Sequence, residues 1–308
     1  MKIKVPVVII VYNRPKNTQK LLKRLDRVKP EKLIIISDGP KKNKIDIKKC
    51  NEVKKITKEI TWKCEKKYIT SNHNMGLKKR IYSGLNKVFK MYEHAIILED
   101  DCLPNKSFFI FCQTMLNIYQ KEKKIAAISG NNFNSVKIDE SFYFSKYSSI
   151  WGWATWRRSW KNFDIDIKFW PNYKKSIQWR NECPDIVERV FWNNIFDRVF
   201  SNDINSWAYS YLLNNFYKKQ LTITPNYNLV KNTGFGKNAT NTLVHEKIFF
   251  PKVREQEKKL IFPKKIISNK FADKIDFGNV FGGGMRNRYP IKFFYMIYLY
   301  VLFFIKKI

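Results

Sequence analysis

Three acidic residues stand in a row directly after a short apolar run. Residues 95–98 are Ala-Ile-Ile-Leu, and Glu99, Asp100 and Asp101 follow them. An apolar run of this length with polar flanks predicts a buried strand, so the carboxylates are expected at the carboxyl edge of a sheet, where open α/β folds bind ligands. Neighbouring carboxylates raise one another's pKa unless a cation lies among them. The triplet therefore predicts a site for a hard divalent metal ion.

Motifs of several other catalytic classes are absent from the sequence. It contains no G-x-x-x-x-G-K-[ST] loop, no G-x-G-x-x-G after the first predicted strand and no G-x-S-x-G elbow. The histidines are only His73, His94 and His245, which disfavours a His-rich zinc site. Carboxylate chemistry is therefore the best-supported chemistry of this chain.

Strands that alternate with helices are expected to position the acids. Apolar runs predict strands at residues 5–11, 33–36, 67–70, 95–98 and 125–129, and helical spacing predicts helices at 15–28, 47–60, 77–92 and 108–119. This alternation predicts an α/β fold with right-handed crossovers and a mostly parallel central sheet flanked by helices.

The pattern changes after Gly130, where short aromatic segments, isolated strands such as residues 221–224 and loops rich in Asn and Gly follow. We interpret residues 1–130 as a nucleotide-binding half and residues 131–247 as an acceptor half of one domain. Residues 248–308 form a basic C-terminal extension, in which weak periodicity over 251–287 predicts an extended, partly ordered arm.

Composition indicates a folded protein with an anionic partner. Of the 308 residues, 44% are hydrophobic, and 59 Lys and Arg against 26 Asp and Glu give a net charge of +33. Nucleic acid, a phospholipid surface or a nucleotide-like substrate would satisfy this charge, although lysines spread over all solvent faces explain most of the excess. Five cysteines without a C-x-x-C pair, and no secretory signal, predict a reduced, cytoplasmic location.

The C-terminal tail predicts contact with a membrane surface. Residues 293–305 are wholly apolar and aromatic, and basic residues flank them at 286, 288, 292, 306 and 307. The segment is too short to span a bilayer comfortably, whereas its basic flanks suit an interfacial helix at the inner face of the cytoplasmic membrane. A core helix or a dimer contact is the alternative.

Five segments resemble motifs of the GT-A fold glycosyltransferases, in the family's order. They are Val8-Ile-Ile-Val-Tyr-Asn-Arg-Pro15, Ile36-Ser-Asp-Gly39, Asn74-Met-Gly-Leu-Lys78, Ile97-Leu-Glu-Asp-Asp-Cys102 and Trp151-Gly-Trp-Ala-Thr-Trp156. The chain is similar to bacterial family 2-type enzymes related to N-acetylglucosaminyltransferase I, some of which are described as haemolytic-protein-like. The resemblance covers about residues 5–245 and leaves out the tail.

This resemblance implies a nucleotide-diphospho-sugar transferase fold and a hexosyl- or N-acetylhexosaminyltransferase activity. The donor would be a UDP-sugar bound with Mn²⁺ or Mg²⁺, and transfer would be inverting. The acceptor would be a bacterial surface glycan such as lipopolysaccharide, lipooligosaccharide or capsule, free or lipid-linked. Nucleic acid is not an expected partner.

The resemblance also implies roles for individual donor-site residues. Asp101 corresponds to the direct metal ligand, while Asp100 lies near the donor ribose and Glu99 belongs to the same site. Asp38 corresponds to the acid that accepts a hydrogen bond from uracil N3–H, although Asp38-Gly39 by itself is a turn signal. Further donor contacts are expected from Tyr12, Asn13, Arg14, Gly76, Lys78 and Lys79. For Arg14 and the two lysines, a solvated basic surface is the alternative role.

Three tryptophans around Gly152 suit a sugar-binding wall. Trp151, Trp153 and Trp156 carry flat apolar faces with N–H groups, which stack well on sugars, and Gly152 lets the backbone approach a donor closely. Core packing is the alternative for these tryptophans. We expect Trp151, Gly152 and Trp153 at the donor.

The catalytic base is the least defined part of the predicted site. An inverting enzyme needs a carboxylate that takes the proton of the acceptor hydroxyl. In the related eukaryotic enzyme this acid follows a tryptophan that matches Trp207, but Ala208 and Tyr209 follow here. Asp203 is the predicted substitute, with a turn or helix N-cap as its alternative role.

Two further assignments complete the predicted site. Asp100 is expected to assist catalysis from the acidic triplet. Residues 228–236 resemble a glycine-containing segment near the acceptor, and His245 just beyond it is a second predicted metal ligand, with a purely structural role as its alternative.

Three other functions compete with glycosyl transfer. The charge and interleaved aromatic residues are compatible with a nucleic-acid-binding protein, but they leave the acidic triplet unexplained. A sugar-nucleotide pyrophosphorylase would carry a Gly-rich loop after its first strand, where this chain has Tyr-Asn-Arg-Pro. A membrane-active, haemolysin-like protein without catalysis is supported by the tail alone.

Overall fold

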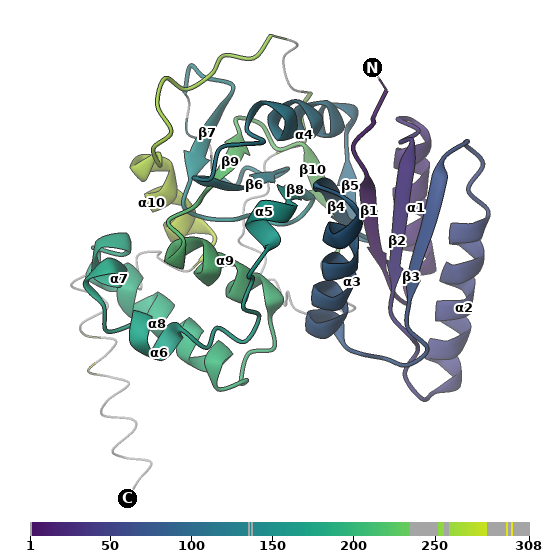
Figure 1. The fold of residues 1–308 in the computed structure, drawn as a ribbon, viewed down its shortest axis with the longest axis horizontal. Helices are drawn as coiled ribbons and strands as arrows, with labels where there is room; N and C mark the ends of the chain where they lie inside the picture. The colour runs from purple at the N-terminus through teal and green to yellow at the C-terminus, as the bar shows by residue number, and fades with distance from the viewer. Residues whose placement is uncertain are drawn as a thin grey trace, which may run out of the picture.

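The computed structural model describes residues 2–134, 136, 138–234, 252–255, 259–281, 294 and 297. Within them an 8-stranded sheet has the order β3-β2-β1-β4-β8-β6-β9-β7 (Figure 1). Its strands are β1 (Val7–Val11), β2 (Lys32–Ser37), β3 (Glu65–Thr70), β4 (His94–Glu99), β6 (Ile125–Ser129), β7 (Phe142–Ser145), β8 (Trp153–Trp156) and β9 (Leu221–Pro225).

The sheet is mostly parallel, as the sequence predicts. β1 pairs in parallel with β2 and β4, β2 with β3, and β6 with β9, whereas β8 and β7 run in the opposite direction. A separate antiparallel pair joins β5 (Cys102–Pro104) to β10 (Val230–Asn232). Because β1 lies between β2 and β4, the crossover direction changes there, and such a switch point opens a crevice at the carboxyl ends of the strands.

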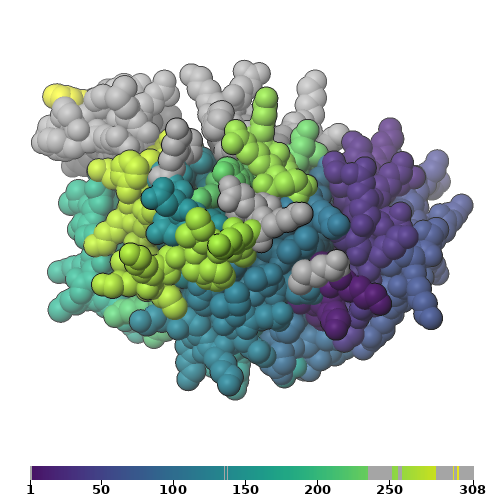
Figure 2. All heavy atoms as spheres, turned by 90° about the horizontal axis from the view of Figure 1, so that it is seen from above, coloured from purple at the N-terminus to yellow at the C-terminus, as the bar shows by residue number. Residues whose placement is uncertain are grey.

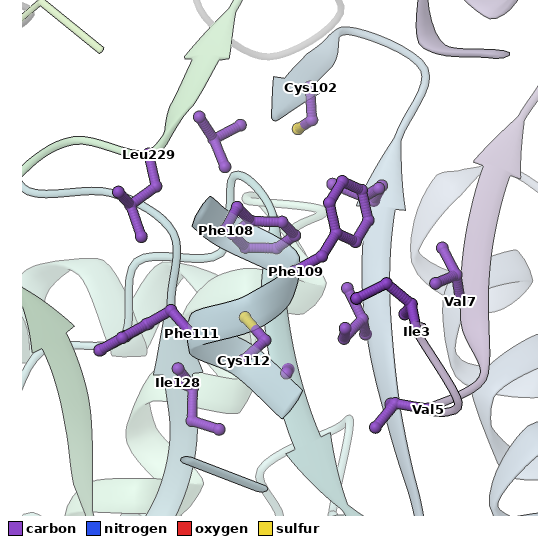
Figure 3. Close-up of a cluster of buried hydrophobic side chains, with 14 of the residues drawn as sticks. Ile3, Val5, Val7, Cys102, Phe108, Phe109, Phe111, Cys112, Ile128 and Leu229 are labelled. Carbon is purple, nitrogen blue, oxygen red and sulfur yellow. The ribbon is translucent and has the colours of Figure 1, made fainter. Parts of the chain in front are cut away.

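Alternate residues of the buried strands face two different helix layers. Val7 and Ile9 of β1 pack in one core cluster with α1 (Pro15–Asp26), α2 (Lys44–Lys58) and α4 (Lys106–Ile118). Figure 3 shows this cluster, in which Phe109 of α4 lies beside Ile3 of the lead-in to the first strand, while Phe111 points to the opposite side. The even-numbered Val8 and Ile10 face the opposite layer. Period-2 alternation between two helix layers produces the three-layer α/β/α arrangement.

The opposite layer is formed by α3 (Leu77–Met91), α5 (Arg157–Trp160) and α9 (Trp207–Tyr217). Beside it lies an aromatic cluster with α6 (Trp170–Tyr173), α7 (Ile177–Glu182) and α8 (Ile186–Phe200). Sequence analysis did not predict these helices beyond residue 130. The reason is that α8 and α9 carry apolar residues on nearly all sides, so that neither helix shows a single apolar stripe of period 3.6.

The C-terminal arm is more ordered than the sequence predicts. It contains α10 (Lys270–Asn279), which begins at the N-cap Asn269 and buries Ala272 and Phe277. The Asn269 backbone N–H donates to the carbonyl oxygen of Phe144 in β7 at 2.7 Å. The expectation of an extended arm is therefore wrong for residues 270–279, because buried contacts from a distant strand stabilise this helix.

Among the described helices, none combines the length and the hydrophobicity that crossing a bilayer requires. The predicted interfacial tail lies outside the described residues, apart from Phe294 and Ile297, which have helical backbone and exposed side chains. The five cysteines are free thiols.

Candidate functional site

One guanidinium group forms ion pairs with two of the three acids at the end of β4. Arg14, which follows β1, places Nη1 3.2 Å from Asp100 Oδ1 and 3.0 Å from Asp101 Oδ2. Parallel pairing of β1 with β4 brings these residues to one sheet edge, although they are far apart in the sequence. The cation that the triplet needs is therefore partly supplied by the chain itself.

Glu99 and Asp100 hold their protons more tightly than ordinary carboxyls do. Burial raises the pKa of Asp100 to about 7, against the opposing effects of Arg14 and the Tyr12 backbone N–H. Burial, and then repulsion by Asp101 and Asp100, raises the pKa of Glu99 to about 8. Among the described residues the Glu99 side chain forms no hydrogen bond or ion pair. Desolvated, closely spaced acids of this kind are common at functional sites.

The segment after β10 packs directly on Asp101. Thr233 donates its backbone N–H to the Asp101 carbonyl at 2.8 Å, and its hydroxyl donates to the same oxygen at 3.1 Å. A Cβ on Gly234 would lie 2.1 Å from Asp101 Oδ2, so only glycine permits this approach. The predicted acceptor segment therefore adjoins the predicted metal ligand, as far as residue 234.

Asp38 organises the loop that leads into α3. Its carboxylate accepts backbone N–H groups from Gly39, Met75 and Gly76 at 2.9 to 3.1 Å, and the Asn74 side-chain amide at 3.2 Å. These donors occupy most of the acceptor positions of a carboxylate. In this arrangement Asp38 ties β2 to the segment after β3, and its predicted contact with uracil stays a prediction.

Tyr12 and Asn13 share a partner that sequence analysis did not single out. The Tyr12 hydroxyl and the Asn13 amide donate to the two carboxylate oxygens of Asp46, in the first turn of α2. Asp46 also accepts the Lys41 backbone N–H at 2.6 Å. Asp46 could have been found from Asn43, a typical helix N-cap residue three positions earlier, whose side chain accepts the Asp46 N–H at the start of α2. Asp46 therefore orients the two predicted donor contacts.

The lysines at the start of α3 have different environments. Lys78 is 8% exposed, and its Nζ lies 3.8 Å from Asp166 Oδ1. Lys79 is exposed, and Gly76 precedes the helix, where its N–H belongs to the Asp38 cluster. Lys79 is therefore solvated in this structure. The diphosphate contacts of Gly76, Lys78 and Lys79 stay predictions.

The tryptophan motif divides between core and surface. Trp153 is 1% exposed and packs among Trp160, Trp207 and Tyr211, so its faces are not available to a sugar. This burial corrects the expectation that Trp153 binds the donor. Trp151 is half-buried, and its ring meets Phe133 edge-on at 5.0 Å.

Gly152 serves the packing of the same motif. It has φ +76, and a Cβ there would lie 2.9 Å from Val230 Cγ2. Its carbonyl accepts the Gly130 N–H at 2.8 Å, which joins the end of β6 to the start of β8. Gly152 thus allows β10 to lie close to the sheet edge, and its approach to a donor is untested.

The predicted catalytic base lies apart from these contacts. Asp203 is exposed in the turn after α8, where its carboxylate accepts the Ser201 hydroxyl at 2.8 Å. This is the turn role considered as the alternative, and the structure describes no contact between Asp203 and the acidic triplet. His245 lies outside the described residues.

A hollow of about 240 Å³ lies away from the acids. It is situated between α2 and the β2–β3 edge and is lined by residues that include Val53, Thr57 and Tyr68. None of the acidic triplet lines it, so it does not help to locate a ligand for them.

The chemistry of the acidic cluster fits a hard cation that also has ligands from a bound molecule. Asp100 and Asp101 offer carboxylate oxygens, which Mg²⁺ and Mn²⁺ prefer. Among the described residues, no group of three His, Cys, Asp or Glu side chains converges as a complete metal site. A metal ion here would take its remaining ligands from water or from a substrate such as a diphosphate.

Comparisons with known proteins give low-level structural similarity only. Protein-family models and curated protein sequences show no match. Among solved structures, the chain is similar to 4-diphosphocytidyl-2C-methyl-D-erythritol synthase from Anaerococcus prevotii, with 12% identity, coverage of 75% of this chain and 93% of that chain, and a TM-score of 0.39.

Two further similar structures are enzymes that were solved with a bound nucleotide sugar. One is a UDP-glucose pyrophosphorylase in complex with UDP-glucose, at 11% identity, 73% and 93% coverage and a TM-score of 0.35. The other is a mannosyltransferase from Pyrobaculum calidifontis with GDP-Man and Mn²⁺, at 12% identity, 70% coverage of each chain and a TM-score of 0.37. Likeness at this level assigns no family and no activity, and the α/β fold class rests on the sheet itself.

Proposed function

We propose that this chain is a metal-dependent glycosyltransferase. It moves a hexosyl or N-acetylhexosaminyl group from a UDP-sugar to a bacterial surface-glycan acceptor at the cytoplasmic face of the membrane. The observation that carries the proposal is the convergence of Arg14, Asp38, Asp100 and Asp101 from three neighbouring strands at the switch point of the sheet. Motif order along the chain supports the same assignment.

Each residue has a role that its environment supports. Arg14 offers charge-assisted hydrogen bonds beside the acids, where a donor diphosphate would bind. Asp101 would hold Mn²⁺ or Mg²⁺, which supplies charge neutralisation for the departing nucleoside diphosphate when bound. The hydrogen bonds that Asp38 accepts from Asn74 and Gly76 hold their loop beside the carboxyl ends of the strands. Trp151, which is half-buried, is the proposed aromatic contact for the sugar.

The acceptor half of the proposal rests on the segment around β10. Thr233 and Gly234 lie against Asp101, so an acceptor bound on that segment would be adjacent to the donor. Asp203 is the proposed base, and Asp203→Asn should then lower transfer while sparing donor binding. Equal transfer by this variant and the wild type would exclude Asp203 as the base.

The decisive test is a thermal-shift panel of nucleotide sugars with the full chain, with and without Mn²⁺. At least one UDP-sugar should stabilise the protein in an Mn²⁺-dependent manner. Asp101→Asn should abolish that shift, whereas Asp26→Asn, an exposed position at the end of α1, should retain it. No Mn²⁺-dependent shift with any UDP-sugar would contradict the proposal.

Donor hydrolysis separates this function from the binding-only alternatives. A nucleic-acid-binding or purely membrane-active protein would leave a UDP-sugar intact. A pyrophosphorylase would instead release a sugar 1-phosphate and consume pyrophosphate in the reverse direction. UDP as the released nucleotide identifies glycosyl transfer or its hydrolytic side reaction.

A further inference from the structure

One stretch of the C-terminal arm exposes lysines and large apolar side chains together. Ile267 and Phe271 are each 65% exposed, and lysines flank both of them. In Figure 2 the described arm, coloured from yellow-green to yellow, extends over one face of the molecule. We call the following exposed residues the lysine–apolar patch: Lys264, Lys265, Ile267, Lys270, Phe271 and Lys274.

The acids of the same segment point into the protein. Asp273 is 3% exposed and accepts the Ser145 hydroxyl at 2.6 Å, while Asp276 is 7% exposed and accepts the Asn134 amide at 3.0 Å. Residues 259–281 contain no other acid. The outward side of this segment is therefore uniformly positive.

The patch is held on a folded base. Ser268 forms a bridge with Phe144 of β7, and the Asn269 side chain caps α10 by accepting the Ala272 N–H. Ala272 and Phe277 are buried beneath the helix. An ordered segment thus presents Ile267 and Phe271 to solvent, whereas Ala272 and Phe277 of the same segment are buried.

The acidic neighbours of the arm lie at its other end. Ile261 exchanges hydrogen bonds with Ser141, which directly follows Asp139 and Glu140. The patch begins after this point, at Lys264. Over residues 264–274 exposed lysines and apolar side chains occur with no exposed acid among them, whereas α2, which also exposes Ile45 and Ile47 beside lysines, carries the exposed Glu52 and, at its C-cap, Glu59.

We propose that the lysine–apolar patch docks on the surface of an anionic phospholipid membrane. Lysines near such a surface are attracted by its negative potential, and Phe and Ile between them bury apolar area at the headgroup boundary. Nucleic acid would satisfy the lysines but gives an isoleucine no base-stacking role. A second copy of a chain with net charge +33 would be repelled. An anionic lipid surface accommodates both the lysines and the apolar side chains of the patch.

Vesicle sedimentation with the full chain tests this inference. The wild type should bind vesicles that contain phosphatidylglycerol and not vesicles of phosphatidylcholine alone, and added salt should weaken the binding. The double variants Lys264→Glu/Lys265→Glu and Ile267→Ser/Phe271→Ser should each lose more than tenfold in affinity. Matched controls on α2, Lys48→Glu/Lys49→Glu and Ile45→Ser/Ile47→Ser, alter exposed residues of the same types and should bind as the wild type does.

Three results would overturn the proposal. Patch variants that bind like the wild type would show that another surface, such as the apolar tail, carries all the affinity. Equal losses in the α2 controls would show a general effect of charge. Binding of single-stranded nucleic acid, or self-association, that the patch variants abolish without any change in vesicle binding would identify a different partner. None of these readouts needs a donor, so they are independent of the proposed glycosyl transfer.

Discussion

At the scale of single residues, Arg14 is the group around which the candidate site is arranged. Its guanidinium lies within 3.2 Å of both Asp100 and Asp101, and it therefore offsets part of a charge that would otherwise oppose folding. The same residue was expected only as a contact to a diphosphate. Arg14 can fill both roles in turn. It pairs with the acids in the free protein, and it can contact a diphosphate when the substrate arrives with a metal ion that pairs with the acids instead.

Arg14→Gln should increase the response of the protein to Mn²⁺. Without the guanidinium, Asp100 and Asp101 repel each other more strongly and have more to gain from a divalent cation. We expect Mn²⁺ to bind the variant about tenfold more tightly in the absence of nucleotide, which corresponds to about 1.4 kcal/mol. Titration calorimetry measures this affinity, with Arg27→Gln at the exposed end of α1 as the control. An unchanged affinity would show that Arg14 does not compete with metal.

Asp38→Asn should destabilise the protein even without nucleotide. The aspartate is buried and accepts N–H groups from Gly39, Met75 and Gly76, whereas an asparagine would turn a second set of donors toward them. The expected loss in unfolding free energy is about 3 kcal/mol, since hydrogen bonds to a charged group are involved. Urea unfolding with and without UDP distinguishes the roles. A variant with wild-type stability and weakened UDP binding would assign Asp38 to the nucleotide alone.

At the scale of elements, the start of β8 separates two kinds of tryptophan. Trp153 lies in the strand and is enclosed by α5 and α9, while Trp151 precedes the strand and is half-buried beside Phe133. Both residues had the same prior expectation because the motif contains them at alternating positions. Residues two apart in one strand lie on the same face, but β8 begins only at Trp153, and Gly152 before it has φ +76, so Trp151 does not share the face of Trp153.

Replacing the two tryptophans should therefore have opposite consequences. Trp153→Ala removes a core side chain and should cost about 4 kcal/mol of unfolding free energy. Trp151→Ala should cost less than Trp153→Ala, because Trp151 is half-buried, and should weaken donor-sugar binding several-fold, since the proposed aromatic contact with the sugar is lost. Chemical unfolding and a binding titration with a UDP-sugar measure the two effects. Similar stability losses in both variants would place Trp151 in the core as well.

At the scale of the whole molecule, buried carboxyls in α10 should make the stability depend on pH. Burial raises the pKa of Asp276 from 3.8 to about 6 and that of Asp273 to about 7. A raised folded-state pKa means that the folded protein binds the proton more tightly than the unfolded chain does. The stabilisation is therefore complete below the unfolded pKa and is lost as the pH rises through the folded pKa.

Asp276→Asn should remove the part of the pH dependence of stability that Asp276 causes. The amide keeps an oxygen acceptor for Asn134 but never carries the buried charge. Between pH 4 and pH 8 the wild type should lose on the order of 3 kcal/mol relative to the variant. Urea unfolding across this range measures the difference. A variant that becomes less stable than the wild type as the pH rises would show that the Asp276 charge is favourable.

The long strands and helices of the first 130 residues follow from local pattern. Continuous apolar runs predict β1, β2, β4 and β6 within two residues of their bounds, and period-3.6 stripes predict α1, α3 and α4. These patterns also place the ends of β1, β2 and β4 at one sheet edge, which is why the acidic triplet could be proposed as a site. Helix α8 escaped prediction because it carries apolar residues on nearly all sides, and α10 because its partners, such as Asn134 and Ser145, lie far away in the sequence.

The sequence alone determined the α/β class, the alternation of strands and helices, and the position of Glu99, Asp100 and Asp101 at a strand end, since these depend on short-range periodicity. Only the tertiary structure decided what each side chain contacts. It paired Arg14 with the acids, enclosed Asp38 in backbone N–H groups and buried Trp153. The physical reason is that a hydrogen bond or a desolvation cost depends on neighbours brought together by strand pairing and helix packing, and a linear pattern does not contain those distances.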